Sequence, residues 1–123
     1  MLDTTVAVDH LRGLPSAVAL LRRLVASGEP LLASELVRFE LLAGVRDHEL
    51  ERLEQFFEAL TWLAVSEEVA RVAGALARQY RAGHSGIDDA DYLIAASALV
   101  LDANLLTTNV RHFPMVEGLR APY

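Results

Sequence analysis

The chain has 123 residues, 53% of them hydrophobic, and a formal net charge of −6. This length fits a single domain over residues 1–123 with a substantial core, and the apolar content excludes a disordered protein. The absence of cysteine excludes disulfides and thiolate metal sites, and the acidic balance excludes a protein that coats nucleic acid through general positive charge.

All eleven basic residues are arginine, and the chain contains no lysine. It therefore has no amine side chain for nucleophilic catalysis and no lysine for a phosphate-binding P-loop. The longest apolar run, 93–101, is far shorter than the roughly 20 residues that span a bilayer. The first residues, MLDTTVAVDH, lack the basic start of a signal peptide. We expect a protein of the reducing cytoplasm without a membrane association.

The hydrophobic pattern predicts short strands that alternate with longer helices. Ser34 and Ser66 stand where helix N-caps are expected, and Glu35 is placed to pair with Arg38 three residues on. The expected strands are 2–3, 30–34, 61–65, 104–108 and, at an edge, 119–122, and the expected helices are about 4–12, 18–28, 35–45, 47–60, 66–83 and 88–101.

This alternation indicates an α/β sandwich, in which helices cover a central, mainly parallel sheet. Ligands of such folds bind beyond the carboxyl ends of the strands. Three expected strands end there in polar residues, at Asp3, at Ser34 and at 107–109. These strand ends predict a functional site at one edge of the sheet.

Three carboxylates lack an evident local partner. Asp3 ends an inner strand, and its alternative role is to cap the next helix. Glu40 lies mid-helix on an apolar stripe with no cation three or four residues away, and its alternative is an exposed position on an imperfect face. Asp91 shares a stripe with small residues, and its alternative is a capping box with Asp88.

Each structural alternative is reasonable alone, but all three carboxylates are expected at the same sheet edge. Like charges that are brought together and partly desolvated repel one another and raise each other's pKa. A divalent cation removes this conflict, and carboxylate and amide oxygens are the ligands that Mg²⁺ or Mn²⁺ prefers. The three acids therefore predict a metal site.

Four segments in order resemble the PIN-domain ribonucleases, and within them the VapC toxins of toxin–antitoxin pairs. They are LDTTV (2–6) with Asp3, SELVRFELLAG (34–44) with Glu40, DADYLIAASAL (89–99) with Asp91, and LLTTNVRHF (105–113) with Asn109 in the fourth acidic position. Each segment alone is a weak signal, but together they span nearly the whole chain. The resemblance implies a PIN-like three-layer α/β/α sandwich with a central, mainly parallel sheet.

The resemblance also implies an endoribonuclease that hydrolyses RNA phosphodiester bonds with Mg²⁺ or Mn²⁺. Asp3, Asp91 and Glu40 would be the ligands, with Glu40 alternatively orienting the attacking water. Thr107 would support them and Asn109, which replaces Asp, would orient a water. Thr5 stands where Ser or Asn is usual, which keeps a hydroxyl group there.

Arg111 is the expected RNA contact, although a plain surface position is its alternative. The implied protein partner is a cognate VapB-type antitoxin, which inhibits the toxin. The implied assembly is a homodimer, or a heterotetramer or larger complex with the antitoxin.

Two other enzyme and signalling classes share part of this pattern. Haloacid-dehalogenase-type phosphohydrolases and phospho-receiver domains also place an aspartate after a first strand, but both need a further acid nearby and a lysine that this chain lacks. A PIN-like binding module with an inert acidic site is the remaining alternative.

Overall fold

The computed structural model describes residues 1–123. Two strands are formed, β1 (Leu32–Ser34) and β2 (Thr61–Leu63). The helices are α1 (Thr4–Leu11), α2 (Pro15–Ala26), α3 (Glu35–Gly44), α4 (Leu50–Glu58), α5 (Glu67–Tyr80) and α6 (Asp89–Val100), with short 3₁₀ helices η1 (Asp47–Glu49) and η2 (Val110–His112).

The strands are short and parallel. β1 pairs with β2 from Leu32 opposite Thr61 to Ser34 opposite Leu63. Leu2 forms single parallel bridges to Ala33 on one side and to Leu106 on the other. The expected parallel sheet is therefore confirmed, but its first and fourth segments are reduced to single bridges.

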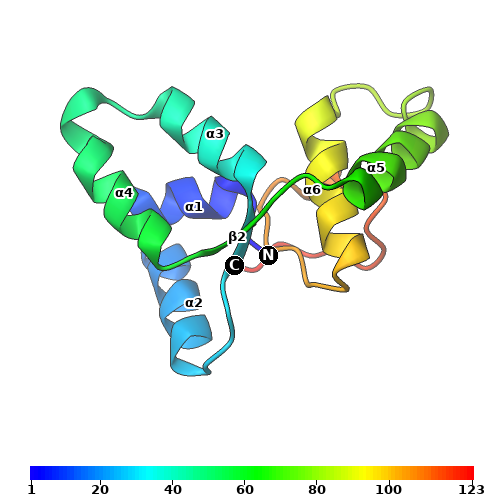
Figure 1. Cartoon of the computed structure of the whole chain (residues 1–123). Helices are drawn as coiled ribbons and strands as arrows, with labels where there is room; N and C mark the ends of the chain where they lie inside the picture. The colour runs from blue at the N-terminus through cyan, green and yellow to red at the C-terminus, as the bar shows by residue number, and fades with distance from the viewer.

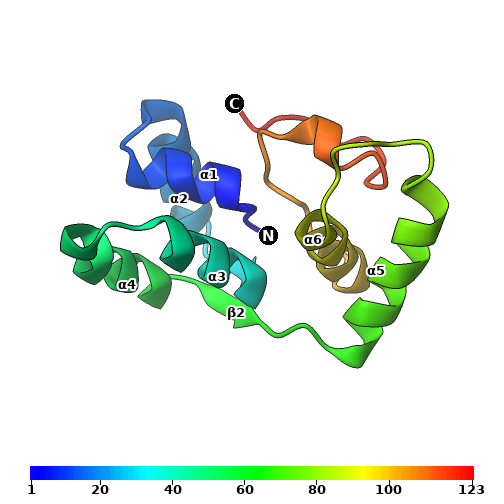
Figure 2. The same ribbon diagram turned by 90° about the horizontal axis from the view of Figure 1, so that it is seen from above.

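Helices cover the strands on both sides. In two perpendicular views, α1, α2, α3 and α4 lie on one side of the central strands and α5 and α6 on the other (Figures 1 and 2). The expected α/β/α arrangement is confirmed. Both chain ends lie near the middle of the molecule in Figure 1, so the first residues run beside the strands.

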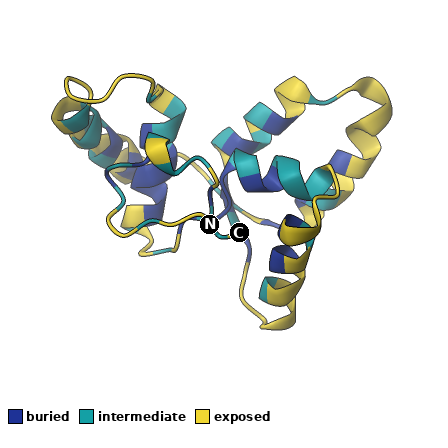
Figure 3. Cartoon of the chain, turned by 180° about the vertical axis from the view of Figure 1, so that it is seen from behind, coloured by how far each residue is buried: buried dark blue, intermediate teal, exposed yellow.

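The core consists of two clusters of buried side chains. The larger has 16 residues and includes most of the inner surface of α6, and the smaller has 7 residues around Leu2 and Ala33. Figure 3 shows that exposed residues cover the outer turns and most connections. None of the helices combines the length and apolar character that crossing a lipid bilayer demands.

Several local predictions are confirmed. The Ser34 hydroxyl accepts a hydrogen bond from the Leu36 amide at 3.1 Å, which caps α3. The Ser66 hydroxyl accepts one from the Val69 amide at 3.2 Å, which caps α5. Arg38 pairs with Glu35 at 2.6 Å.

The predicted edge strand 119–122 is wrong, because no strand forms there. Gly118 turns the chain with φ 72°, and Pro122 has no amide hydrogen to donate to a neighbouring strand. The end of the chain is instead attached by a side chain, since the Tyr123 hydroxyl donates to the Asp9 carboxylate at 2.6 Å.

We predict that Ser66→Ala lowers the free energy of unfolding by about 1 kcal/mol, because the first turn of α5 loses its side-chain acceptor. Ser16→Ala is the matched control, since Ser16 is exposed in the first turn of α2 and its hydroxyl makes no hydrogen bond. Urea unfolding of both variants measures the difference. Equal midpoints would contradict the capping role of Ser66.

Candidate functional site

Asp3 is buried at the end of the first strand segment. Its amide donates to the Leu106 carbonyl at 2.9 Å, and the residue is 5% exposed. Asp3 occupies the N-cap position of α1, but its carboxylate makes no capping hydrogen bond. Instead, Oδ2 accepts from the Thr107 hydroxyl at 2.7 Å. The side-chain capping alternative is therefore wrong for Asp3.

Two threonines hold this carboxylate in place. The hydroxyl groups of Thr5 and Thr107 lie 3.2 Å apart, and the Thr5 hydroxyl is also 3.4 Å from Asp3 Oδ2. Thr5 accepts from the Thr108 amide at 3.1 Å, and Thr107 accepts from the Asn109 amide at 3.0 Å. The network ties the start of α1 to the chain segment after Leu106.

Glu40 projects from the middle of α3 and is half-buried. Its Oε1 accepts a hydrogen bond from the Thr4 hydroxyl at 2.9 Å, so the exposed alternative is wrong. Burial raises the pKa of Glu40, the Thr4 hydrogen bond opposes this, and the negative charges of Asp3 and Asp88 raise it further. Glu40 is thus within electrostatic range of carboxylates from two other segments.

Asp91 has two structural partners. It forms a capping box with Asp88, in which the Asp91 amide donates to Asp88 Oδ1 at 3.0 Å and the Asp88 amide donates to Asp91 Oδ2 at 3.3 Å. The capping alternative is confirmed for this residue. The same Oδ2 lies 3.1 Å from His112 Nδ1, in η2.

Burial raises the pKa of Asp91 to about 6. The charge of Asp88 raises it as well, while the Asp88 amide and His112 act in the opposite direction. The negative charge of Asp91 is therefore unfavourable in the folded protein even though the residue caps a helix. The capping hydrogen bond with the Asp88 amide is therefore not enough to bring the pKa of Asp91 back to its usual value.

Asn109 and Arg111 follow Thr107 in the chain, and the Asn109 amide donates to the Thr107 hydroxyl. Asn109 precedes η2 and is partly buried, and its side-chain amide makes no hydrogen bond. Arg111 is exposed within η2 and forms no ion pair. Both side chains are free to contact a ligand.

Two contributors are absent from the sequence-based site. Thr4 had a weak signal, as a hydroxyl residue directly after Asp3 at the start of a helix. His112 stands open, like its neighbour Arg111, as a surface residue or an RNA contact, but its contact with Asp91 had no signal, because it joins residues 21 apart and arises only where η2 passes the first turn of α6.

The acidic groups are near one another without forming a closed cluster. No group of three or more His, Asp or Glu side chains is close enough to hold a metal ion together. No arginine pairs with Asp3, Glu40 or Asp91. Asp3, together with Glu40 and Asp91, whose pKa values are raised, supplies the carboxylate oxygens that a hard dication prefers. The side chains would have to move to hold such an ion together.

The family model of the PIN domain matches residues 1–118. The chain is 63% identical over 123 residues to Ribonuclease VapC19 of Mycobacterium tuberculosis, covering 100% of this chain and 98% of the relative. It is 38% identical to Ribonuclease VapC10 of the same species, with coverage of 100% and 92%.

Solved structures share the fold. VapBC2 from Rickettsia felis, bound to a DNA fragment from their promoter, superposes with a TM-score of 0.84 at 24% identity and covers 98% of this chain and 95% of that one. VapBC-1 from nontypeable Haemophilus influenzae gives 0.80 at 25% identity, with coverage of 98% and 94%. The chain therefore belongs to the PIN-domain family, and within it to the VapC group.

Proposed function

We propose that this chain is a metal-dependent endoribonuclease, the toxin of a toxin–antitoxin pair, which acts on RNA in the cytoplasm. The observation that carries the proposal is the buried Asp3 carboxylate, which Thr107 holds at 2.7 Å while no arginine pairs with it or with Glu40. The 63% identity to a protein named as a ribonuclease supports the reaction class.

Asp3, Glu40 and Asp91 are the residues that would hold Mg²⁺ or Mn²⁺. Asp3 is the best prepared, because Thr107 fixes its Oδ2 while Oδ1 accepts no hydrogen bond from the protein. A divalent ion held by these carboxylates would lower the pKa of a bound water and stabilise negative charge on the phosphate oxygens.

The other roles follow from the contacts of each side chain. Glu40, which accepts a hydrogen bond from Thr4, would alternatively act as the base that orients the attacking water instead of as a ligand. Thr5 and Thr107 keep Asp3 in one orientation. Asn109 and Arg111 are free to contact the phosphate.

The proposed protein partner is a VapB-type antitoxin. The two solved relatives described above are VapBC structures. This chain also exposes large apolar side chains on its early helices, including Phe39 (68% exposed) and Val25 (59% exposed). We propose that such positions are covered in a homodimer, or in a heterotetramer or larger complex with the antitoxin.

A PIN-like binding module with an inert site is the alternative function. Metal titration separates the two, because an inert module has no reason to bind Mn²⁺ tightly. We predict that calorimetry detects Mn²⁺ binding to the protein, and that Asp3→Asn weakens it by about 10-fold or more. Absence of binding by the unmodified protein would favour the inert module.

We predict that Asp3→Asn reduces RNA cleavage by about 100-fold or more, because an amide keeps the acceptor for Thr107 but removes a charge that holds the metal. EDTA should reduce cleavage by the unmodified protein to a similar extent. Asp102→Asn is the matched control, since Asp102 is exposed and makes no side-chain hydrogen bond, and Asn tolerates its φ of 50°. Cleavage that survives both EDTA and Asp3→Asn would reject the mechanism.

The raised pKa of Asp91 predicts a pH dependence of stability. The folded protein holds this proton up to about pH 6, whereas an aspartate in the unfolded chain has a pKa of about 3.8, so folding binds a proton between these values. The free energy of unfolding should therefore be higher at pH 4 and fall by about 1–3 kcal/mol as the pH rises to 6. Asp91→Asn should flatten this part of the profile.

Urea unfolding in EDTA at several pH values measures the effect of Asp91→Asn, and Asp102→Asn again serves as the control. The difference between the two profiles isolates the contribution of Asp91 from that of other titrating groups. Parallel profiles for the two variants would show that Asp91 carries no unfavourable charge in the folded protein.

A further inference from the structure

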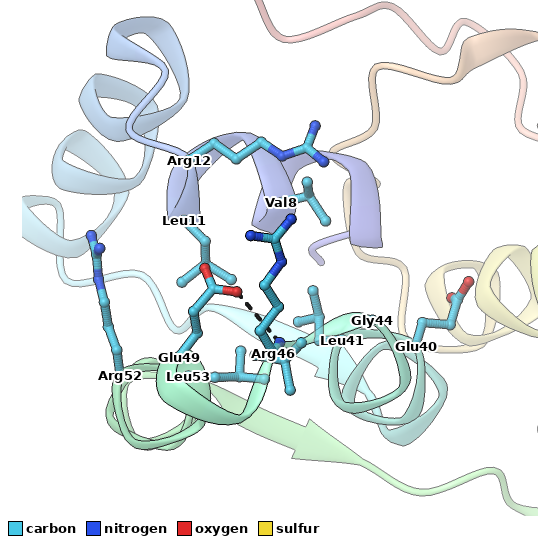
Figure 4. Close-up of a pocket in the computed structure, with 11 residues that line it drawn as sticks. Val8, Leu11, Arg12, Glu40, Leu41, Gly44, Arg46, Glu49, Arg52 and Leu53 are labelled. Carbon is cyan, nitrogen blue, oxygen red and sulfur yellow. Dashed lines mark hydrogen bonds between the residues drawn. The ribbon is translucent and has the colours of Figure 1, made fainter.

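A cavity of about 500 Å³ lies beside the acidic site, between α1, α3 and α4. Three of the residues that line it are arginines from separate segments: Arg12 after α1, Arg46 before η1 and Arg52 on α4. Glu40 also lines it, so the cavity adjoins the proposed catalytic residues. We name it the arginine cavity (Figure 4).

The three arginines are not neutralised by ion pairs. The salt bridges of the arginines in this chain involve Arg38, Arg71 and Arg81, all outside the cavity. Glu49 is the other acid in the lining, and its Oε1 accepts weakly from the Arg46 amide at 3.4 Å rather than from a guanidinium. Against a chain charge of −6, the lining carries a small positive excess.

His10, which precedes the lining residue Leu11 on α1, also lies near arginine charges. His10, on α1, is partly buried, and burial lowers its pKa. The positive charges of Arg52 and Arg22 lower it further. Arg52, which lines the cavity, therefore acts electrostatically on α1, and its guanidinium has no carboxylate partner.

The shape of the cavity narrows the choice of anion. In Figure 4, Arg12 extends from α1 and Arg46 rises towards α1 from the opposite wall, while Glu40 lies on the side that faces α6. Apolar side chains, including Leu11, Leu41 and Leu53, line the rest. A volume of about 500 Å³ suits one or two nucleotides and not a duplex, and unpaired bases can contact an apolar wall.

We propose that the arginine cavity binds backbone phosphates of single-stranded RNA next to the bond that is cleaved. The inference rests on the proposed RNA-cleaving function, because it assigns the part of the substrate that lies outside the acidic site. The part of an RNA strand that extends beyond the carboxylates needs positive charges to balance its phosphates. Arg12, Arg46 and Arg52 line the cavity that begins at Glu40. Guanidinium groups bind phosphate with two parallel hydrogen bonds, which fixes both position and orientation.

The test measures RNA binding and not cleavage, so that it is independent of the catalytic step. The double variant Arg46→Ala/Arg52→Ala is compared with Arg71→Ala/Arg78→Ala, which removes the same charge from α5, on the other side of the strands. Binding of a fluorescent single-stranded RNA is followed in EDTA at several salt concentrations, and circular dichroism checks that each variant is folded.

We expect the cavity variant to bind RNA about 10-fold or more weakly, and the α5 variant to bind like the unmodified protein. Loss of two phosphate contacts should also reduce the slope of log affinity against log salt by about 1.4, because each contact with a single strand contributes about 0.7. Arg46→Lys/Arg52→Lys should restore most of the slope but only part of the affinity, since lysine keeps the charge without the paired hydrogen bonds.

If both double variants weakened RNA binding equally, the inference would be overturned, because the effect would then come from the net charge of the protein and not from the cavity. Unchanged RNA binding by the cavity variant, combined with weaker binding of an acidic antitoxin peptide, would also overturn it and assign the cavity to a protein partner. Failure of the proposed function has a different signature, in which the unmodified protein with Mn²⁺ leaves every RNA uncut whatever the cavity variants bind.

Discussion

The site depends on the pairing of one residue, Leu2, with strands on both sides. The Leu2 amide donates to the Leu32 carbonyl at 2.7 Å. On the other side, the Leu106 amide donates to the Met1 carbonyl at 2.8 Å, and the Asp3 amide donates to the Leu106 carbonyl at 2.9 Å. Leu2 is fully buried, so the short strand is held by packing as well as by hydrogen bonds. This pairing sets Asp3 against Thr107, two residues that are 104 positions apart. Without it, the start and the end of the chain would have no common site.

Near this pairing, charged side chains without a partner of opposite charge lie in two adjacent regions, one acidic and one basic. The carboxylates of Glu40 and Asp91 have raised pKa values because they are partly buried without a guanidinium partner. In the neighbouring cavity, Arg46 and Arg52 lack carboxylate partners. No ion pair joins these carboxylates to these arginines. This separation fits the proposed RNA substrate, whose phosphate groups, together with a cation, would bridge the two regions.

Much of the local structure could be predicted because it depends on neighbours in the sequence. The caps at Ser34 and Ser66 and the pair of Glu35 with Arg38 each join residues within one helical turn. The parallel order of the strands followed from the alternation of apolar segments. The four positions Asp3, Glu40, Asp91 and Asn109 came from the family resemblance, and their roles as ligands stay predictions.

The features that the sequence did not reveal depend on distant contacts. His112 meets Asp91 only because the chain after the last strand segment returns over the start of α6. The segment 119–122 was expected to pair as a strand, but Gly118 turns it and the hydroxyl of Tyr123 attaches the end elsewhere. For Asp91, the capping alternative is confirmed, while its proposed role as a metal ligand stays a prediction.

Asp91 caps α6 although its charge is unfavourable in the folded protein, which matters for attempts to stabilise the protein. Asp88 and Asp91 close the first turn of α6, yet the buried charge on Asp91 works against the folded state. An uncharged acceptor such as asparagine would retain the turn and remove the penalty. Laboratory selection for heat resistance or for high expression would therefore enrich neutral residues at this position and, if Asp91 holds the metal as proposed, yield stable proteins without activity.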